Sequence, residues 1–204
     1  MTTVPPPALQ APASSDAMTD HRGRQLVPHQ THLTYEQARL GMGFHEAAHA
    51  VLAMVNGMRV QASEIIAWVP EPGMSRVTGC TTTTAAADFD VWGFAALSAA
   101  GEVAELEYLM AYGLWTPERA AACSASHDRD LAIDVLAARG YTLTTGEAPA
   151  GGKTWVMVQG MARRKVTDLW SHIRTVAVAM NERTTLTGDD IAGLTGLTNP
   201  EVAA

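Results

Sequence analysis

Two histidines and one glutamate occur within a single apolar, alanine-rich stretch, His45-Glu46-Ala47-Ala48-His49. Burying imidazole and carboxylate groups costs free energy unless each of them finds a partner. In a helix, residues four apart lie one turn above each other on the same face. His45 and His49 can therefore both direct a ring nitrogen at one metal ion, and this spacing is typical of zinc-binding helices.

Glu46 would lie about 100° around the helix from His45, beside the ion rather than on it. From there its carboxylate can hold a metal-bound water and act as a base. The alternative interpretation is a surface helix with two unrelated histidines. Phe44 before the motif and Val51-Leu52 after it favour a buried helix instead, so zinc is the cofactor that we expect.

The third zinc ligand must come from elsewhere in the chain. A catalytic zinc site has three protein ligands and a fourth position for water, and the next histidine after His49 is His127. The acidic stretch 126–130 supplies Asp128 as the first candidate, with Asp130 and His127 behind it. Alternatively, these acids only favour the start of a helix through its dipole. Spacing alone does not choose between these interpretations.

The surrounding patterns predict mainly helices with one small β element. Thr34 and Gln37 form a capping-box pattern, so we expect a helix from about Tyr35 to Asn56, ended by Gly57. Two strands, Val60–Val69 and Ser75–Thr84, should flank a Pro/Gly turn. The remaining expected elements are helices at 91–112, from 117, at 127–138 with Ser124 or Ser126 as its cap, at 153–181 and after 187, with a loop at 141–152.

We therefore expect one domain at 34–197, a helical bundle around the histidine helix with a small hairpin or sheet. Residues 1–33 are rich in Pro, Ala, Ser and Thr and should form a disordered tail, and residues 198–204 a flexible C-terminus. The net charge of −7 and the scattered Lys and Arg residues argue against nucleic-acid binding. Only two cysteines occur, and no signal peptide or 18-residue apolar run is present, which predicts a cytoplasmic protein without a membrane span.

Four separated segments resemble, in order, the peptidase domain of the FtsH-type family, the zinc proteases of ATP-driven membrane-bound hexamers. They are Phe44–Ala50, Val77–Thr81, Ala100–Glu105 with Ser124–Asp128 and the helix Leu131–Ala138, and Thr185–Ile191. The resemblance covers about residues 34–194 and implies a mostly helical, zincin-like fold. It also implies His45, His49 and Asp128 as zinc ligands, Glu46 as catalytic base, and Glu105 as a partner of a ligand histidine.

The sequence departs from the family pattern at several positions. Ala48 and His127 stand where the family usually has Gly and Asn, and Glu102 stands where it has Arg. The ATPase module of the family is absent from the sequence. We therefore expect no unfolding of substrates by this chain itself, and a dedicated partner protein or a separate ATPase as its partner.

The resulting hypothesis is a zinc metalloendopeptidase that hydrolyses flexible or unfolded polypeptide through a water activated by Glu46. Substrate would lie extended along the edge strand Arg76–Thr81 and pair with it through backbone hydrogen bonds. Two alternatives stay open: a non-catalytic or regulatory interaction module with structural zinc, and a repressor-cleaving regulatory peptidase. Glu46 favours catalysis, because a structural site needs no base there. The resemblance at Thr185–Ile191 counts against the repressor-cleaving type.

Overall fold

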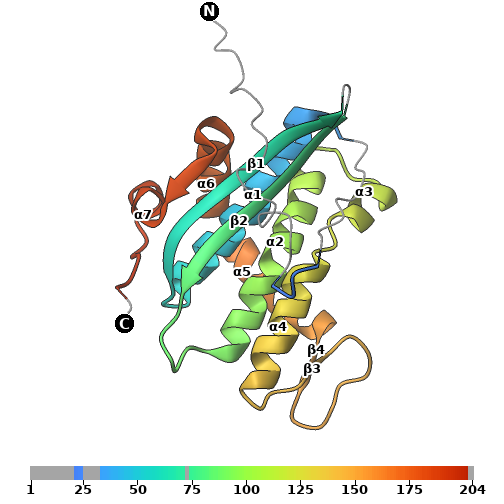
Figure 1. Cartoon of the computed structure of the whole chain (residues 1–204), viewed down its shortest axis with the longest axis vertical. Coiled ribbons are helices and arrows are strands. Elements are labelled where there is room, and N and C mark those ends of the chain that lie inside the picture. Colours follow the sequence, from blue (N-terminus) through green and yellow to red (C-terminus); the bar gives the residue numbers. More distant parts are fainter. Residues whose placement is uncertain (1–20, 25–32, 72–73, 202–204) are drawn as a thin grey trace, which may run out of the picture.

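The computed structural model describes residues 21–24, 33–71 and 74–201 and is mainly helical with a small antiparallel sheet (Figure 1). The helices are α1 (Tyr35–Val55), α2 (Val91–Ala111), α3 (Pro117–Ala122), α4 (Ser126–Ala138), α5 (Trp155–Asp168), α6 (Trp170–Arg183) and α7 (Gly188–Thr195). The strands are β1 (Arg59–Glu71), β2 (Met74–Thr84), β3 (Leu143–Thr144), β4 (Lys153–Thr154) and β5 (Thr185–Thr187).

Helix α1 is the central element of the fold. Its capping box forms as predicted, with Thr34 accepting from the backbone of Gln37 and the Gln37 side chain accepting from the backbone of Thr34. The segment 43–54 is buried throughout, because the β1–β2 hairpin crosses one side of the helix while α2 and α6 pack against the others (Figure 1). Its alanines allow this close packing. The motif of two histidines and a glutamate is therefore interior, as its apolar flanks predicted.

The aromatic ring of Phe44 joins three helices next to the motif. It stacks on Tyr108 of α2 with ring centroids 5.1 Å apart and on Trp170 of α6 at 5.0 Å. Stacked aromatic pairs of this kind add to the stabilisation that burial of their apolar area provides. The residue directly before His45 is thus fixed in the core, which fixes the start of the motif.

Three strands form the main sheet, in the order β2-β1-β5. The predicted hairpin is confirmed: β1 pairs with β2 antiparallel along most of its length, from Arg59 opposite Thr84 to Glu71 opposite Met74. Strand β5 was not predicted, because three residues are too few to show a strand period; it pairs with β1 at 62–64. In the part of the chain that the structure describes, β2 has a partner on one side only and is an edge strand.

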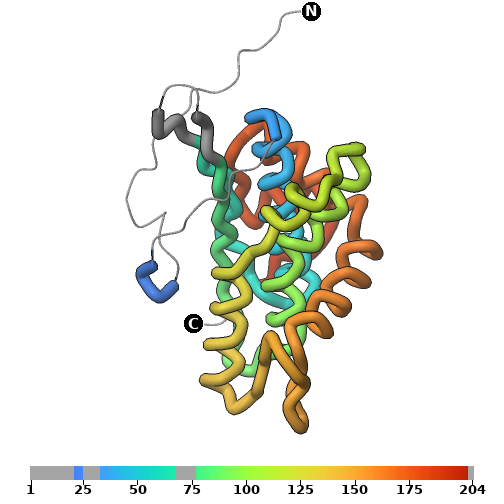
Figure 2. The backbone as a smooth tube through the Cα atoms, turned by 90° about the vertical axis from the view of Figure 1, so that its right-hand side faces the viewer, coloured from blue at the N-terminus to red at the C-terminus, as the bar shows by residue number. Residues whose placement is uncertain are grey.

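The predicted helix 153–181 is wrong as a single element. Lys153 and Thr154 form β4, the Thr154 side chain caps α5, and the helix is interrupted at Leu169. Helix α5 packs on α2 whereas α6 packs on α1 and α7, so one straight helix could not cover both surfaces. Figure 2 shows α4 and α5 on opposite sides of α2.

The predicted cap of α4 needs correction. Neither Ser124 nor Ser126 caps α4, whose N-cap is Ala125 without a side-chain hydrogen bond. The expected flexible C-terminus includes Asn199, which exchanges hydrogen bonds with the backbone of Val60. Of the expected tail, residues 21–24 lie beside α4, where Arg22 donates to Asp134 at 2.7 Å. Residues 1–20, 25–32 and 202–204 are outside the described ranges.

Within the described ranges, no helix combines the length and the apolar character that crossing a bilayer demands.

Candidate metal centre

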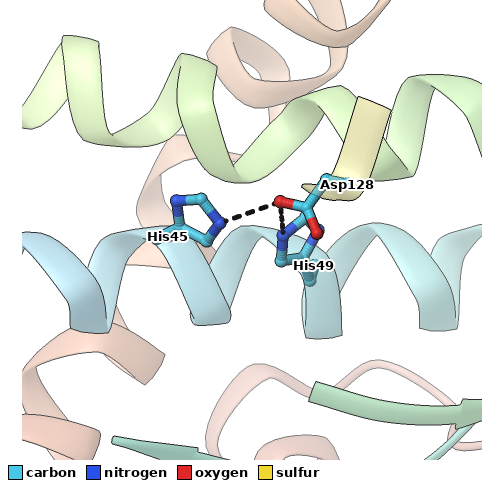
Figure 3. Close-up of side chains that lie close together, drawn as sticks. All are labelled: His45, His49 and Asp128. Atoms are coloured by element: carbon cyan, nitrogen blue, oxygen red, sulfur yellow. Dashed lines mark hydrogen bonds and ion pairs between the residues drawn. The ribbon is translucent and has the colours of Figure 1, made fainter. Parts of the chain in front are cut away.

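His45, His49 and Asp128 converge in the interior (Figure 3). Each of them offers one donor atom, and these atoms lie within 4.8 Å of one another. The Asp128 Oδ2 atom is 3.2 Å from His45 Nε2 and 3.4 Å from His49 Nε2. Among the residues that the structure describes, no second group of His, Cys, Asp or Glu side chains comes together in this way. Two imidazole nitrogens and one carboxylate oxygen are a donor set that suits a divalent cation such as zinc.

Helix α2 provides a hydrogen-bond partner for the Nδ1 atom of each imidazole ring. The Nδ1 atom of His45 lies 3.4 Å from Glu105 Oε2, and that of His49 lies 2.9 Å from the carbonyl oxygen of Leu97. A hydrogen bond at Nδ1 leaves Nε2 as the atom that faces the ligand position, an arrangement common to metal-binding histidines. The Glu105 contact agrees with the role that the family resemblance implied, whereas no sequence pattern pointed to Leu97.

Gly101 provides the space for the two rings. It lies one turn from both Leu97 and Glu105 on α2, and a Cβ atom there would come within 2.6 Å of His49 Nε2 and closer still to His45 Nε2. Real Cβ atoms essentially never approach another atom that closely. In the sequence, Gly101 is notable only because it belongs to the segment Ala100–Glu105, which resembles the FtsH-type family. Its spacing of four residues from Glu105 is the pattern that could have indicated a role in the site.

The three candidates for the third ligand are separated by the geometry. Asp128 is in the first turn of α4 and faces both histidines. Asp130 instead accepts from Arg24 at 2.7 Å and belongs to an ion-pair cluster on the outer side of α4. His127 is partly exposed, with its Nε2 atom 3.2 Å from Asp128 Oδ1, the carboxylate oxygen that does not bridge the histidines.

Glu46 is buried but lies against the sheet rather than inside the group of three. Its Oε2 atom accepts a hydrogen bond of 2.7 Å from Thr81 Oγ1 on β2, and Thr81 is in turn 2.8 Å from Ser63 Oγ on β1. A Cβ atom at Gly79 would lie 2.6 Å from Glu46 Oε1. Gly79 therefore lets the edge strand cover this carboxylate closely, and Thr81 fixes its direction.

Burial and neighbouring charges act in opposite directions on the pKa values at this site. Burial lowers the pKa of His45, but hydrogen bonds to Asp128 and Glu105 and the charge of Glu46 raise it to well above its usual 6.5. Burial raises the pKa of Asp128, yet His49, His45 and His127 bring it far below its usual 3.8. Three carboxylates, those of Asp128, Glu105 and Glu46, thus act on the one imidazole of His45, and negative charge gathered around the ligand position favours a bound cation.

These shifts predict how the stability of the metal-free protein depends on pH. The raised pKa of His45 in the folded state gives a contribution that is complete below about pH 6.5 and is lost as the pH rises through that raised value. The lowered pKa of Asp128 gives a contribution that is present above about pH 3.8 and is lost on further acidification. Chelator-treated protein should therefore be most stable between these values and less stable at pH 8.5, as measured by urea midpoints.

The control for this prediction is Asp128→Asn, which removes the carboxylate charge and keeps the shape. It should show a flatter profile between pH 5.5 and 8.5 in the same chelator. Equal pH dependence in the two proteins would contradict the assignment of the effect to this pair.

Comparisons with family models and with curated proteins give no relative to support or oppose a function. No family model matches the sequence, and no curated protein matches it. The functional interpretation of the chain therefore depends on the geometry of the site.

Proposed function

We propose that the chain is a zinc metallopeptidase with His45, His49 and Asp128 as zinc ligands and Glu46 as the catalytic base. The observation that carries the proposal is the convergence of three donor atoms from α1 and α4 next to a buried carboxylate. Catalytic zinc sites use three protein ligands of this type, while structural sites are usually closed by four. Asp128 keeps 14% of its side-chain surface exposed, and the adjoining His127 side chain is 42% exposed, so the protein surface begins next to the ligands.

The chemistry is peptide hydrolysis by general base and general acid catalysis. When bound, zinc supplies Lewis acidity and lowers the pKa of a coordinated water toward about 7. Glu46 takes a proton from the attacking water at a carboxylate oxygen and returns it to the nitrogen of the leaving amine. Thr81 keeps the Glu46 Oε2 atom directed along β2, and Glu105 and Leu97 keep the two imidazoles oriented.

The substrate would be an extended segment of flexible or unfolded polypeptide. Strand β2 is an edge strand in the described structure, so its outer backbone groups can pair with an added strand. Its residues Gly79 and Thr81 touch Glu46, and a peptide along this edge would therefore pass the base. Because such pairing uses backbone groups, a dedicated partner protein or a separate ATPase would select what is cut.

The family resemblance is consistent with this proposal. Three of the four resembling segments belong to α1, β2 and the pair α2 and α4, the elements that contain the ligands, the base and their supports. The fourth forms β5 and the start of α7, at the opposite edge of the sheet from β2. We therefore infer a zincin-like, FtsH-type peptidase domain.

The experiment is Glu46→Gln in the full chain loaded with zinc. The variant should keep its zinc and lose cleavage of an unfolded casein-type substrate by about 100-fold or more, the usual size of a general acid–base contribution. Glu36→Gln on the exposed start of α1 is the matched control and should cleave like wild type. Full activity in Glu46→Gln would show that Glu46 is not the base.

A non-catalytic role of the metal has one observation in its favour. The contact between Glu46 and Thr81 joins α1 to β2, so the glutamate also has a structural use. In that case zinc-loaded wild type would cleave no unfolded chain at all, and Glu46→Gln would lower the thermal midpoint. The same two measurements therefore separate the enzyme from a zinc-stapled interaction module.

A further inference from the structure

The first turn of α4 begins without a side-chain cap of its own. Its N-cap, Ala125, makes no capping hydrogen bond, although the first N–H groups of a helix need partners when they are buried. Ala125 itself is only 5% exposed. Asp128 lies in this turn, so any freedom at the start of α4 moves the third ligand directly.

The carboxylate of Glu102 on α2 meets this turn. It accepts a hydrogen bond from the side-chain amide of Gln159 on α5, and hydrogen bonding to the backbone of Ala125 lowers its pKa. Glu102 is 9% exposed, and its burial raises its pKa while the two hydrogen bonds and nearby charges oppose that rise. The side chain therefore connects the two helices that flank α2 on opposite sides (Figure 2).

We infer that Glu102 is a positioning residue for Asp128: by holding the start of α4 against α2 and α5, it keeps the third ligand within reach of both histidines. This inference rests on the metal site of the proposed function. Glu102 is one residue after Gly101, whose missing side chain makes room for the two rings. The one helix α2 thus sets the positions of all three ligands, through Leu97, Glu102 and Glu105.

Glu102 meets α4 at Ala125, close to Asp128, and this position explains why Glu102 should affect metal affinity and not only folding. Ala125 and Asp128 are separated by less than one helical turn, and negative charge close to the start of a helix is favourable. Helix α4 packs on α2 but has few contacts with α1. The distance between Asp128 and the histidines is therefore controlled by how α4 is held on α2.

The test compares Glu102→Met with Glu102→Gln in the full chain, with Co²⁺ as a spectroscopic probe and zinc affinity measured by competition. Methionine keeps the volume but removes both acceptors, and it should weaken metal binding about 10- to 100-fold, as losses of supporting residues do in other metal sites. Glutamine keeps an acceptor for Ala125, and Gln159 can turn its own carbonyl toward the new amide. Glu102→Gln should therefore bind close to wild type.

Glu107→Met is the matched control, because Glu107 lies on a different face of α2; it should bind like wild type. A double-variant cycle then tests the route of the effect. If Glu102 acts through Asp128, Glu102→Met should cause no further loss of Co²⁺ affinity once Asp128→Ala is present. An additive loss would overturn the positioning role.

Equal affinity in Glu102→Met and wild type would overturn the inference and leave the metal site intact. Weak binding in a folded Glu102→Gln would also overturn it, because the hydrogen bonds would not be the cause. Should Glu102→Met fail to fold, Gln159→Leu removes one of the two bonds and is expected to weaken binding less, and unchanged affinity there would count against the inference. No metal binding by wild type would refute the proposed function itself.

Discussion

Replacing Asp128 with alanine should lower zinc affinity by at least about 100-fold, a larger loss than removal of a supporting residue causes. The variant removes one of three donors and leaves two imidazoles without the oxygen that lies 3.2 and 3.4 Å from them. Helical content should change little, because α4 is held mainly by α2. Metal analysis of the purified protein and isothermal titration with zinc measure the effect.

Asp130→Ala and His127→Ala are the controls for this experiment. Both residues are candidates from spacing, but Asp130 pairs with Arg22 and Arg24 on the outer side of α4. His127 contacts Asp128 at Oδ1, whereas Oδ2 is the oxygen that lies near both histidines. We expect Asp130→Ala to bind zinc like wild type and His127→Ala to lose only a small factor. If Asp130→Ala lost as much affinity as Asp128→Ala, the assignment of the third ligand would be wrong.

Gly101→Ala should abolish metal binding although it removes no polar group. In an ordinary helix interior, alanine is more favourable than glycine by about 1 kcal/mol. Here the added methyl group would occupy the position next to both Nε2 atoms, so the rings must turn away from Asp128. Zinc content and the Co²⁺ spectrum should both show the loss, while circular dichroism stays helical.

Gly160→Ala in α5 provides the matched comparison. No atom lies within 4 Å of a Cβ built on Gly160, so this variant should keep its zinc and gain up to about 1 kcal/mol of stability. A Gly101→Ala protein that binds zinc normally would show that the rings have other room, and the geometry of the centre would need revision.

The predictable parts of the site are those encoded within one helical turn. The spacing of His45 and His49, the flanking apolar residues and the Thr34 cap identify α1 and its buried face from the amino-acid sequence alone. The third ligand is different in kind: His45 and Asp128 are 83 positions apart in sequence, and spacing alone leaves Asp128, Asp130 and His127 open. The acidic stretch puts Asp128 first and the family resemblance implies the same residue, but only the folded chain shows which of the three lies beside the histidines.

The supporting residues are harder to find for a physical reason. Gly101 and Glu102 lie in an alanine-rich helix, where residue type alone does not reveal a role in the site. Their importance depends on which side chains pack against them. The error at 153–181 has the same origin, because the helical pattern continues through Leu169 while the packing partners change from α2 to α1. Likewise, Ser124 and Ser126 are plausible caps by residue type, but the N-cap of α4 is Ala125, which makes no side-chain capping hydrogen bond.

The joining of α1 to α4 through three side chains encloses the hairpin, α2 and α3 within one loop of the chain. A metal ion can bind only after those intervening elements have reached their native positions, because α1 and α4, the two ends of this loop, both pack on α2. Zinc binding would therefore report that the tertiary structure is complete. A chain whose strands had paired wrongly could form every helix and still bind no ion.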